Sequence, residues 1–215
     1  MNTFKALESA KTDEGNTLSI VEKSIDSLPE GELLIKVSYS SLNYKDALSA
    51  SGAPGVTRNY PHIPGIDAVG TISQSVDDNF KEGDIVIVTG YDLGMNTSGG
   101  FGEYIRVPSA WAIKLPSTLT EKESMCLGTA GLTAGLSIQA ISEFDSTNGF
   151  NDSKSIVTGS TGGVGSIALM LLAKLGSQVT AVTGKESQKE LLLNLGAAEI
   201  LSREELSEVS RKPMG

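Results

Sequence analysis

The chain has very few of the side chains that bind soft metal ions, with one cysteine, Cys126, and one histidine, His62, among 215 residues. A single cysteine cannot form a disulfide within the chain, and such scarcity is typical of proteins in a reducing compartment. We therefore expect a cytoplasmic protein. The same counts exclude a zinc site built from several cysteines and histidines, and we expect no metal.

Positive charge and long apolar runs are scarce as well. The chain has 17 Lys and Arg against 26 Asp and Glu, which gives a formal net charge of −9. This acidic balance argues against a surface for nucleic acid. No apolar run reaches the roughly 18 residues of a membrane-spanning helix, and residues 1–10 lack the apolar core of a signal peptide. We expect a soluble globular protein that binds neither nucleic acid nor membrane.

Residues 1–118 have the pattern of an all-β domain. Short runs of apolar or alternating residues are separated by turns rich in Gly, Pro, Asn and Asp. Alternation in 33–40 predicts a half-buried strand, and a short helix is expected within 41–50, starting near Ser41 or Asn43. Turns at such short intervals predict a barrel or a sandwich. The strands that we expect lie at 4–8, 18–22, 33–40, 65–72, 85–88 and 111–115, with a further turn and strand over 99–107.

From residue 119 the pattern changes to alternating helices and strands. Thr120 and Glu123 have the spacing of a capping box at the start of a helix that reaches about Ile141. Gly128 and Gly131 interrupt this helix. After a polar linker at 144–153, we expect strands at 155–158, 178–183 and 199–201, with a helix at 167–175. This order predicts an α/β unit with a parallel sheet.

A glycine-rich turn joins the first of these strands to its helix. It reads Gly159-Ser160-Thr161-Gly162-Gly163-Val164-Gly165. Glycines let backbone N–H groups approach a phosphate, and a helix N-terminus adds the positive end of its dipole. In the motif G-x-G-x-x-G, Ser160 takes the first position, and Gly162 and Gly165 take the second and third. We predict that residues 160–165 bind the pyrophosphate of a dinucleotide, and a corner without a ligand is the alternative.

The end of the second strand of the α/β unit indicates which dinucleotide binds. NAD sites place a carboxylate there to accept from the ribose hydroxyls, and this chain has none at the strand end. Thr183, Gly184 and Lys185 offer a hydroxyl, a backbone N–H and a cation to a 2′-phosphate, and Arg203 could add a second cation. We predict NADPH as the cofactor. A solvated surface role for Lys185 is the alternative, and Glu186 is the rival acidic residue beyond the strand.

Three segments resemble one enzyme family. Residues 61–70, PHIPGIDAVG, look like the P-x-x-x-G-H-E-x-x-G segment of the medium-chain dehydrogenase/reductases. Residues 99–104, GGFGEY, are similar to that family's G-G-x-A-E-Y strand, and residues 129–134, TAGLTA, to its C-A-G-x-T-A helix. The resemblance covers the whole chain. It implies a GroES-like β-barrel catalytic domain over 1–118 and a Rossmann NAD(P)-binding domain over 119–215.

The departures from the family pattern concern zinc. Zinc enzymes of this family place a Cys near Asn43, a His at Ile66, a Glu at Asp67 and a Cys at Thr129. Three of these four positions here cannot supply a soft or imidazole ligand. The chain therefore resembles the zinc-independent branch, which contains quinone oxidoreductases and enoyl reductases.

Two further strings, SSLNYKDAL at 40–48 and IPGID at 63–67, resemble the bacterial acryloyl-CoA reductase group more narrowly. The resemblance implies an NADPH-dependent oxidoreductase that transfers hydride to the C=C bond of an enone or enoyl-CoA thioester, or to a quinone, without zinc. The alternative is a non-catalytic relative that binds NADPH as a structural or assembly factor.

The resemblance also implies catalytic roles for Asn43, Tyr44 and Asp46, which lie where the zinc branch holds a ligand and its proton relay. Tyr44 resembles the family tyrosine that contacts the cofactor. Asn43 could orient substrate or nicotinamide, and Asp46 could serve in a proton relay. The structural alternatives are a helix cap for Asn43, a half-buried aromatic for Tyr44 and a solvated carboxylate for Asp46. Asp67 is expected to form a pocket wall or hydrogen bonds rather than to act as a base.

The number of strands is smaller than the resemblance requires. A complete Rossmann sheet has about six strands, and three are found here. We therefore expect a truncated chain that lacks the later strands and part of the nicotinamide pocket. The family resemblance implies a homodimer for the full-length protein.

Overall fold

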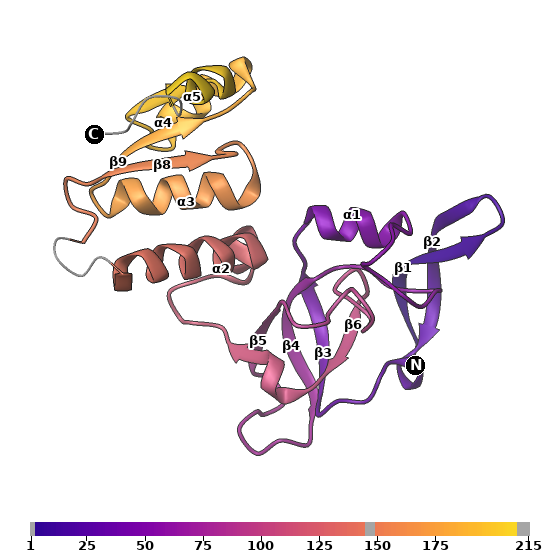
Figure 1. Cartoon of the computed structure of the whole chain (residues 1–215). Coiled ribbons are helices and arrows are strands. Elements are labelled where there is room, and N and C mark those ends of the chain that lie inside the picture. Colours follow the sequence, from indigo (N-terminus) through magenta and orange to yellow (C-terminus); the bar gives the residue numbers. More distant parts are fainter. Residues whose placement is uncertain (1–2, 145–148, 210–215) are drawn as a thin grey trace. The chain divides into compact units, whose positions relative to one another are not determined.

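The computed structural model describes residues 3–144 and 149–209, and the chain divides into two compact units, Met1–Thr129 and Ala130–Gly215 (Figure 1). The first unit is β-rich and the second is an α/β unit, as the sequence predicts. A division into compact units does not test where functional domains end. The boundary expected after residue 118 therefore stays a prediction.

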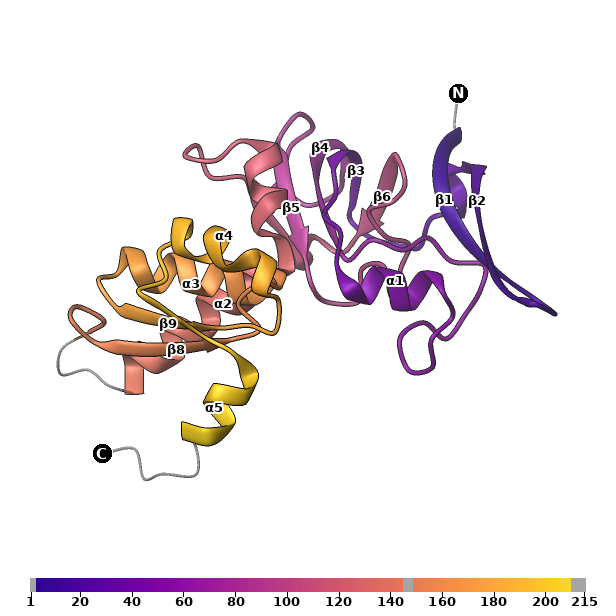
Figure 2. The ribbon, with the colours of Figure 1, turned by 90° about the horizontal axis from the view of Figure 1, so that it is seen from above.

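The first unit contains a two-stranded ribbon and a five-stranded sheet, both antiparallel. The ribbon pairs β1 (Thr3–Thr12) with β2 (Gly15–Ser24), and Figure 2 shows it as a long twisted pair beside the sheet. The sheet has the strand order β6-β3-β4-β5-β7. Its strands are β3 (Leu33–Tyr39), β4 (Asp67–Ser75), β5 (Ile85–Thr89), β6 (Tyr104–Val107) and β7 (Ala112–Lys114). The helical elements are η1 (Ile25–Ser27), α1 (Tyr44–Ala50) and η2 (Ser109–Trp111).

The start of β3 is buried on both faces, so the predicted half-buried strand is wrong for this part. Leu33 and Ile35 lie in the core of the five-stranded sheet. Leu34 points to the other face and packs in a second cluster with Phe4 of β1. Phe4 and Ala6 of the ribbon pack on this face, and the Leu7 backbone N–H donates to the Phe101 carbonyl oxygen at 2.9 Å. The alternation of apolar and polar residues in this strand predicts one buried face. It does not show that the apolar residue on the second face is also buried, because that depends on which segment packs against it.

The second unit is built on a parallel sheet with the order β10-β9-β8. The strands are β8 (Lys154–Thr158), β9 (Gln178–Val182) and β10 (Glu199–Leu201), and the helical elements are α3 (Gly163–Lys174), η3 (Glu186–Gln188), α4 (Lys189–Asn194) and α5 (Arg203–Val209). Helix α3 packs against β8 and β9 (Figure 1). Leu169, Val179 and Leu192 are completely buried in this core. The parallel order places the glycine turn, which follows β8, at the same sheet edge as the end of β9.

Helix α2 (Glu121–Phe144) begins in the first unit, and its start confirms the predicted capping box. The Thr120 hydroxyl accepts the Glu123 N–H at 3.2 Å, and the Glu123 carboxylate accepts the Thr120 N–H at 2.9 Å. The Thr120 hydroxyl also donates to the Glu123 carboxylate at 2.7 Å, and this bond, followed by that from the Thr120 N–H, lowers the pKa of Glu123. Gly128 has φ 48° and ψ −152°, so it breaks the helix as the sequence suggested.

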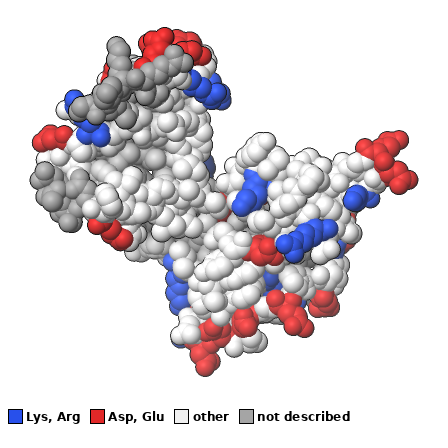
Figure 3. Space-filling model, viewed as in Figure 1, with Lys and Arg blue, Asp and Glu red and all other residues white. Residues whose placement is uncertain are grey.

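Helix α2 alone among the described helices has the length and apolar composition of a membrane span. Core helices of globular proteins pass the same test, and Ala134 and Ile138 of α2 are buried in the second unit. We therefore draw no membrane assignment from it. On the face drawn in Figure 3, acidic and basic side chains are scattered and form no continuous basic patch.

Candidate functional site

The glycine turn after β8 has the backbone geometry that a dinucleotide site requires. Gly159 has φ 62°, in the left-handed region that favours glycine, so this residue makes the tight turn. A Cβ added to Gly165 would overlap the Gly159 carbonyl oxygen, so α3 packs directly on the turn. The turn glycine of the motif is therefore Gly159, whereas the sequence analysis gave the first position to Ser160. The G-x-x-G-x-x-G spacing of Gly159, Gly162 and Gly165 was the signal that could have identified it.

Ser160 is completely buried and holds two strands together. Its hydroxyl donates to the Val157 carbonyl oxygen at 2.6 Å and accepts the Val182 N–H at 3.1 Å. Its backbone N–H also donates to the Val182 carbonyl oxygen at 3.3 Å, so both donors of Ser160 are used within the protein. Its predicted contact with the cofactor stays a prediction.

The start of α3 fits a pyrophosphate group. The first N–H groups of a helix have no acceptor within the helix, and those of Gly163, Val164 and Gly165 lie in this first turn. A cleft of about 510 Å³ borders the turn and is mostly apolar elsewhere. Its lining comes from α2, β8 and α3 and includes Ile138, Ile156, Gly159, Gly162, Val164 and Ala168. The turn can therefore bind an anionic group beside an apolar wall.

The residues predicted to bind the 2′-phosphate come together at the ends of β9 and β10. Thr183 is buried, its N–H donates to the Leu201 carbonyl oxygen at 3.1 Å, and its hydroxyl accepts the Lys185 N–H at 3.0 Å. A Cβ added to Gly184 would lie 3.4 Å from Arg203 Nε, so the Arg203 side chain passes close to Gly184. Lys185 and Arg203 are exposed, and neither has an ion pair with a described residue. Two cations therefore remain available at this corner.

Glu186, the rival acidic residue, is already paired. Its Oε2 lies 2.7 Å from Lys189 Nζ, one helical turn further along the chain. This hydrogen bond raises the pKa of Lys189. The carboxylate therefore has a partner in the protein, while Lys185 has none among the described residues.

A buried polar cluster surrounds Asp67 in the first unit. Asp67 is the first residue of β4 and is completely buried. Its carboxylate accepts hydrogen bonds from the Ser41 hydroxyl, from Asn43 Nδ2 at 2.9 Å, and from the N–H and hydroxyl of Thr129 at 2.9 and 2.7 Å. The expectation that Asp67 forms hydrogen bonds is confirmed. Asn43, Asp67 and Thr129, three of the four positions compared with zinc ligands in the sequence, thus meet in one hydrogen-bonded cluster.

Asp46 is buried at the start of α1, so the solvated alternative is wrong. Its Oδ2 accepts the Asn43 N–H at 2.8 Å, and its Oδ1 accepts the N–H groups of Gly65 and Ile66 at 3.2 and 2.9 Å. Burial raises the pKa of Asp46, and these backbone hydrogen bonds partly oppose the rise. The carboxylate therefore joins α1 to the segment before β4.

Tyr44, the first residue of α1, is 80 % exposed rather than half-buried. Leu42 is 89 % exposed, and Asn43 lies between the two at the N-cap of α1. Asn43 therefore matches the helix-cap alternative in position, although its side-chain amide nitrogen bonds Ser41 and Asp67. Two apolar side chains thus stand exposed beside the polar cluster. The catalytic roles of Asn43, Tyr44 and Asp46 stay predictions.

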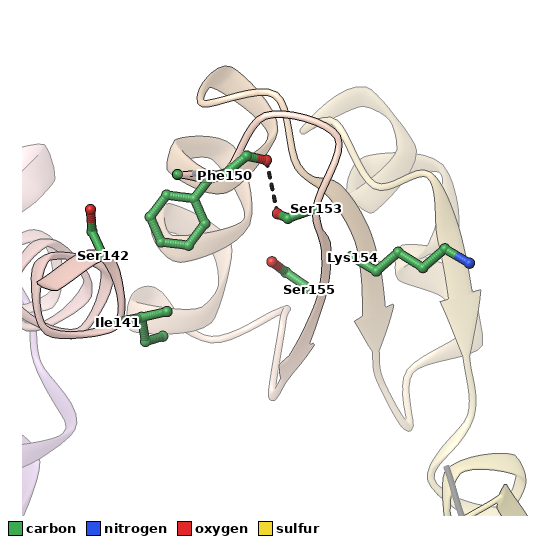
Figure 4. A pocket seen from close by; sticks show the side chains of 7 residues that line it. Ile141, Ser142, Phe150, Ser153, Lys154 and Ser155 are labelled. Atoms are coloured by element: carbon green, nitrogen blue, oxygen red, sulfur yellow. Dashed lines mark hydrogen bonds between the residues drawn. The ribbon is translucent and has the colours of Figure 1, made fainter. Parts of the chain in front are cut away.

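A second, smaller pocket of about 140 Å³ lies at the other end of β8 (Figure 4). Ile141, Phe150 and Ser155 line it, and the Ser153 hydroxyl donates to the Phe150 carbonyl oxygen at 2.8 Å. Lys154 and Ser155 begin β8, whereas the glycine turn follows its end. This pocket therefore lies away from the glycine turn, and Ile141 lines both this pocket and the larger cleft.

Comparison with known proteins agrees with this geometry. Residues 29–117 match the family model of the alcohol dehydrogenase GroES-like domain. Acrylyl-CoA reductase AcuI of Ruegeria pomeroyi is 40% identical over 213 residues, which cover 98% of this chain and 64% of AcuI. The structure of Escherichia coli K-12 YhdH with bound NADPH has a TM-score of 0.87 and 42% identity, over 93% of this chain and 61% of YhdH. These similarities, which extend over nearly the whole chain, agree with the resemblance to the medium-chain dehydrogenase/reductases.

A third relative is similar over the whole chain. The structure of Bacillus subtilis yhfP with NAD bound has a TM-score of 0.92 and 40% identity, over 100% of this chain and 65% of that protein. The chain thus spans less than two thirds of each of these three relatives. The fold class predicted from the sequence, a GroES-like domain followed by a Rossmann unit, is confirmed.

Proposed function

We propose that this chain belongs to an NADPH-dependent oxidoreductase that reduces the C=C bond of an activated α,β-unsaturated carbonyl compound. The proposed substrates are acryloyl-CoA-type thioesters or other enones, with quinones as a second class. The similarity to AcuI, named an acrylyl-CoA reductase, supports the first class. The exposed apolar residues beside the Asp67 cluster suit a small apolar acyl group.

The observation that best supports NADPH is the pair of cations, Lys185 and Arg203, which follow the ends of β9 and β10 in the parallel sheet. Lys185 and Arg203 are exposed without a described ion-pair partner, while the nearby Glu186 is paired with Lys189. A 2′-phosphate needs cations here and a ribose 2′-hydroxyl needs a carboxylate acceptor. This balance favours NADPH over NADH. The bound NADPH of the related YhdH is consistent with this preference, although the related yhfP holds NAD.

Bound NADPH would supply the hydride, and the residues of this chain would bind and orient it. The turn of residues 160–165 would hold the pyrophosphate, with the backbone N–H groups of Gly163, Val164 and Gly165 as donors, because the Gly162 N–H already donates to the Gly159 carbonyl oxygen at 2.9 Å. Thr183, Gly184, Lys185 and Arg203 would surround the 2′-phosphate. Tyr44 is exposed and can contact the cofactor with its ring. Asn43 and Asp46 bond neighbouring backbone and side chains, which favours roles in holding the site in place.

We propose that the reaction needs no zinc. The oxygen atoms of Asp67 accept four hydrogen bonds, so the carboxylate is satisfied by protein donors. The described residues contain no group of three or more His, Cys, Asp and Glu side chains arranged to hold a metal ion. Activity that survives removal of metal by a chelator would support this proposal, and stoichiometric zinc in the purified protein would contradict it.

The test is NADPH oxidation by the whole gene product, with acryloyl-CoA, crotonyl-CoA and small quinones as substrates. We expect turnover with at least one enoyl thioester and a lower KM for NADPH than for NADH. Tight NADPH binding with no oxidation across the panel would favour the alternative of a non-catalytic relative. A cytoplasmic location and a homodimer remain proposals, which fractionation and a sizing column would test.

A further inference from the structure

We infer that Thr129 and Asp67 are positioning residues that fix the side-chain amide of Asn43 with both of its hydrogens turned into the protein. Through Asn43 they fix the start of α1 and hence Tyr44. The effect on cofactor binding rests on the proposed function, because it assumes that Tyr44 contacts NADPH. The orientation of the amide does not depend on that function.

The orientation of Asn43 follows from the donors and acceptors around it. A carboxylate only accepts hydrogen bonds, so the group that faces Asp67 Oδ2 at 2.9 Å must be the amide nitrogen of Asn43. The second hydrogen of that nitrogen points to the Ser41 hydroxyl oxygen at 2.9 Å. The Ser41 hydroxyl in turn donates to Asp67. Both hydrogens of the Asn43 amide are therefore used inside the cluster.

This orientation limits what Asn43 can do in a reduction. Addition of hydride to an enone places negative charge on the carbonyl oxygen, which needs hydrogen-bond donors. Asn43 has no side-chain donor left, and its amide oxygen, which takes part in the capping box with the Asp46 N–H, only accepts. Asn43 therefore does not stabilise that oxygen. A ligand group that meets Asn43 must itself be a donor, such as a hydroxyl or a carboxamide NH₂.

Thr129 reaches Asp67 because the helix is broken one residue earlier. Gly128 has φ 48°, and a Cβ added there would lie 2.6 Å from Asp67 Oδ2, so only glycine permits this approach. The break turns the Thr129 N–H and hydroxyl towards the carboxylate, one to each oxygen. Thr129 thereby holds both Asp67 oxygens in place. The oxygen that receives Asn43 cannot rotate away while these bonds persist.

The cluster then acts on Tyr44 through the chain. Asn43 is the N-cap residue of α1, and Tyr44 is the next residue. The side-chain amide of Asn43 donates to Asp67, and the backbone N–H of Asn43 donates to the Asp46 carboxylate. These two bonds fix the backbone at the start of α1. The ring of Tyr44 is exposed and has no hydrogen bond to a described residue. Its direction therefore depends on the backbone of this first turn.

The first experiment measures the Asn43 amide directly in the ligand-free chain. We expect its two side-chain hydrogens to exchange with solvent at least about tenfold more slowly than those of the exposed Asn194, since both are bonded. Thr129→Val keeps the shape of the side chain and removes its hydroxyl, and should speed exchange of the Asn43 side-chain hydrogens about tenfold. Thr129→Ser keeps a hydroxyl and should restore the slow exchange. The matched control Thr118→Val changes an exposed threonine of the same unit and should have no effect.

The second experiment measures cofactor use in the whole gene product. Thr129→Val should raise the KM for NADPH about tenfold while kcat changes by less than about twofold, and Thr129→Ser should restore the KM. A variant that loses thermal stability but keeps its KM would show a merely structural role and overturn the proposal. Equal amide exchange in Asn43 and Asn194 would overturn it as well. If no substrate is reduced, the proposed function fails, and the amide exchange still decides the orientation.

Discussion

The carboxylate of Asp46 accepts the backbone N–H of Ile66 at 2.9 Å, and this bond ties the first turn of α1 to the residue before β4. The same oxygen accepts the Gly65 N–H, and the other oxygen accepts the Asn43 N–H. One buried side chain therefore satisfies three backbone donors. Buried donors of this kind are costly when they lose their acceptor.

Asp46→Asn should destabilise the protein by about 1–3 kcal/mol, because an amide has one acceptor oxygen and its NH₂ must face a backbone donor. Urea denaturation monitored by circular dichroism measures the loss. Asp78→Asn changes an exposed carboxylate of the same unit that has no described hydrogen bond, and should change stability by less than about 0.5 kcal/mol. Equal effects of the two substitutions would contradict the anchoring role of Asp46.

His62 should make the protein less stable as the pH falls. It is buried, and its Nε2 has no hydrogen-bond partner among the described residues. Burial lowers its pKa below the ordinary value of 6.5, opposed in part by a hydrogen bond to the Gly94 backbone and by the charge of Asp92. The unfolded chain therefore takes up a proton at His62 near pH 6.5, and the folded chain takes it up only at a lower pH, so stability present above about pH 6.5 is lost as the pH falls.

The free energy of unfolding should accordingly fall between about pH 7 and pH 5 more steeply in the wild type than in His62→Gln, by up to about 1.4 kcal/mol per pH unit. Because His62 is the only histidine, its imidazole signals can be followed by NMR without ambiguity. A midpoint at or above 6.5 in the folded protein would show that burial does not govern its titration.

Gly165→Ala should separate α3 from the glycine turn. The added methyl group would overlap the Gly159 carbonyl oxygen, and the backbone on both sides leaves no flexible side chain to move. We expect a loss of about 1–3 kcal/mol in stability and at least about tenfold weaker NADPH binding, measured by cofactor fluorescence. Gly135→Ala is the control, because no atom lies within 4 Å of its added Cβ outside the helix backbone and its chain neighbours. That substitution should stabilise α2 by about 0.5–1 kcal/mol.

Lys185→Ala should weaken NADPH binding by about 1–3 kcal/mol and leave NADH binding nearly unchanged, because only NADPH carries the 2′-phosphate. Titration with both cofactors measures the two affinities. Lys174→Ala removes an exposed lysine at the end of α3, which precedes the start of β9 rather than following its end, and should affect neither cofactor. An equal loss for NADPH and NADH would mean that Lys185 does not contact the 2′-phosphate.

Local signals made several parts of the structure predictable. The capping box joins Thr120 and Glu123, which are three residues apart, so a short stretch of sequence is enough to predict it. The strand, glycine turn and helix around residues 155–175 are equally local, because glycine spacing and apolar periodicity act over a few residues. The grouping of Thr183, Gly184 and Lys185 follows from their adjacency. Arg203 could be added because parallel strands of one sheet end at the same edge.

The Asp67 cluster could not be assembled from local signals. Asn43 lies 24 residues before Asp67 and Thr129 lies 62 residues after it, and each is an ordinary cap or helix residue by its own neighbours. The family resemblance pointed to these positions as former ligand sites, and only the structure showed which atoms bond. The burial of Asp46 was missed for a similar reason, since its partners Gly65 and Ile66 are distant in the chain.

The sequence by itself thus determined the order of elements, the β-rich and α/β parts, the glycine turn after β8 and the cations after β9 and β10, because periodicity, glycine placement and charge act over short distances. Only the tertiary structure decided which side chains are buried, which hydrogen bonds satisfy Asp46 and Asp67, and that Gly159 rather than Ser160 makes the turn. These outcomes depend on where distant segments pack. A carboxylate in a loop and a carboxylate in a core look the same until the donors around it are known.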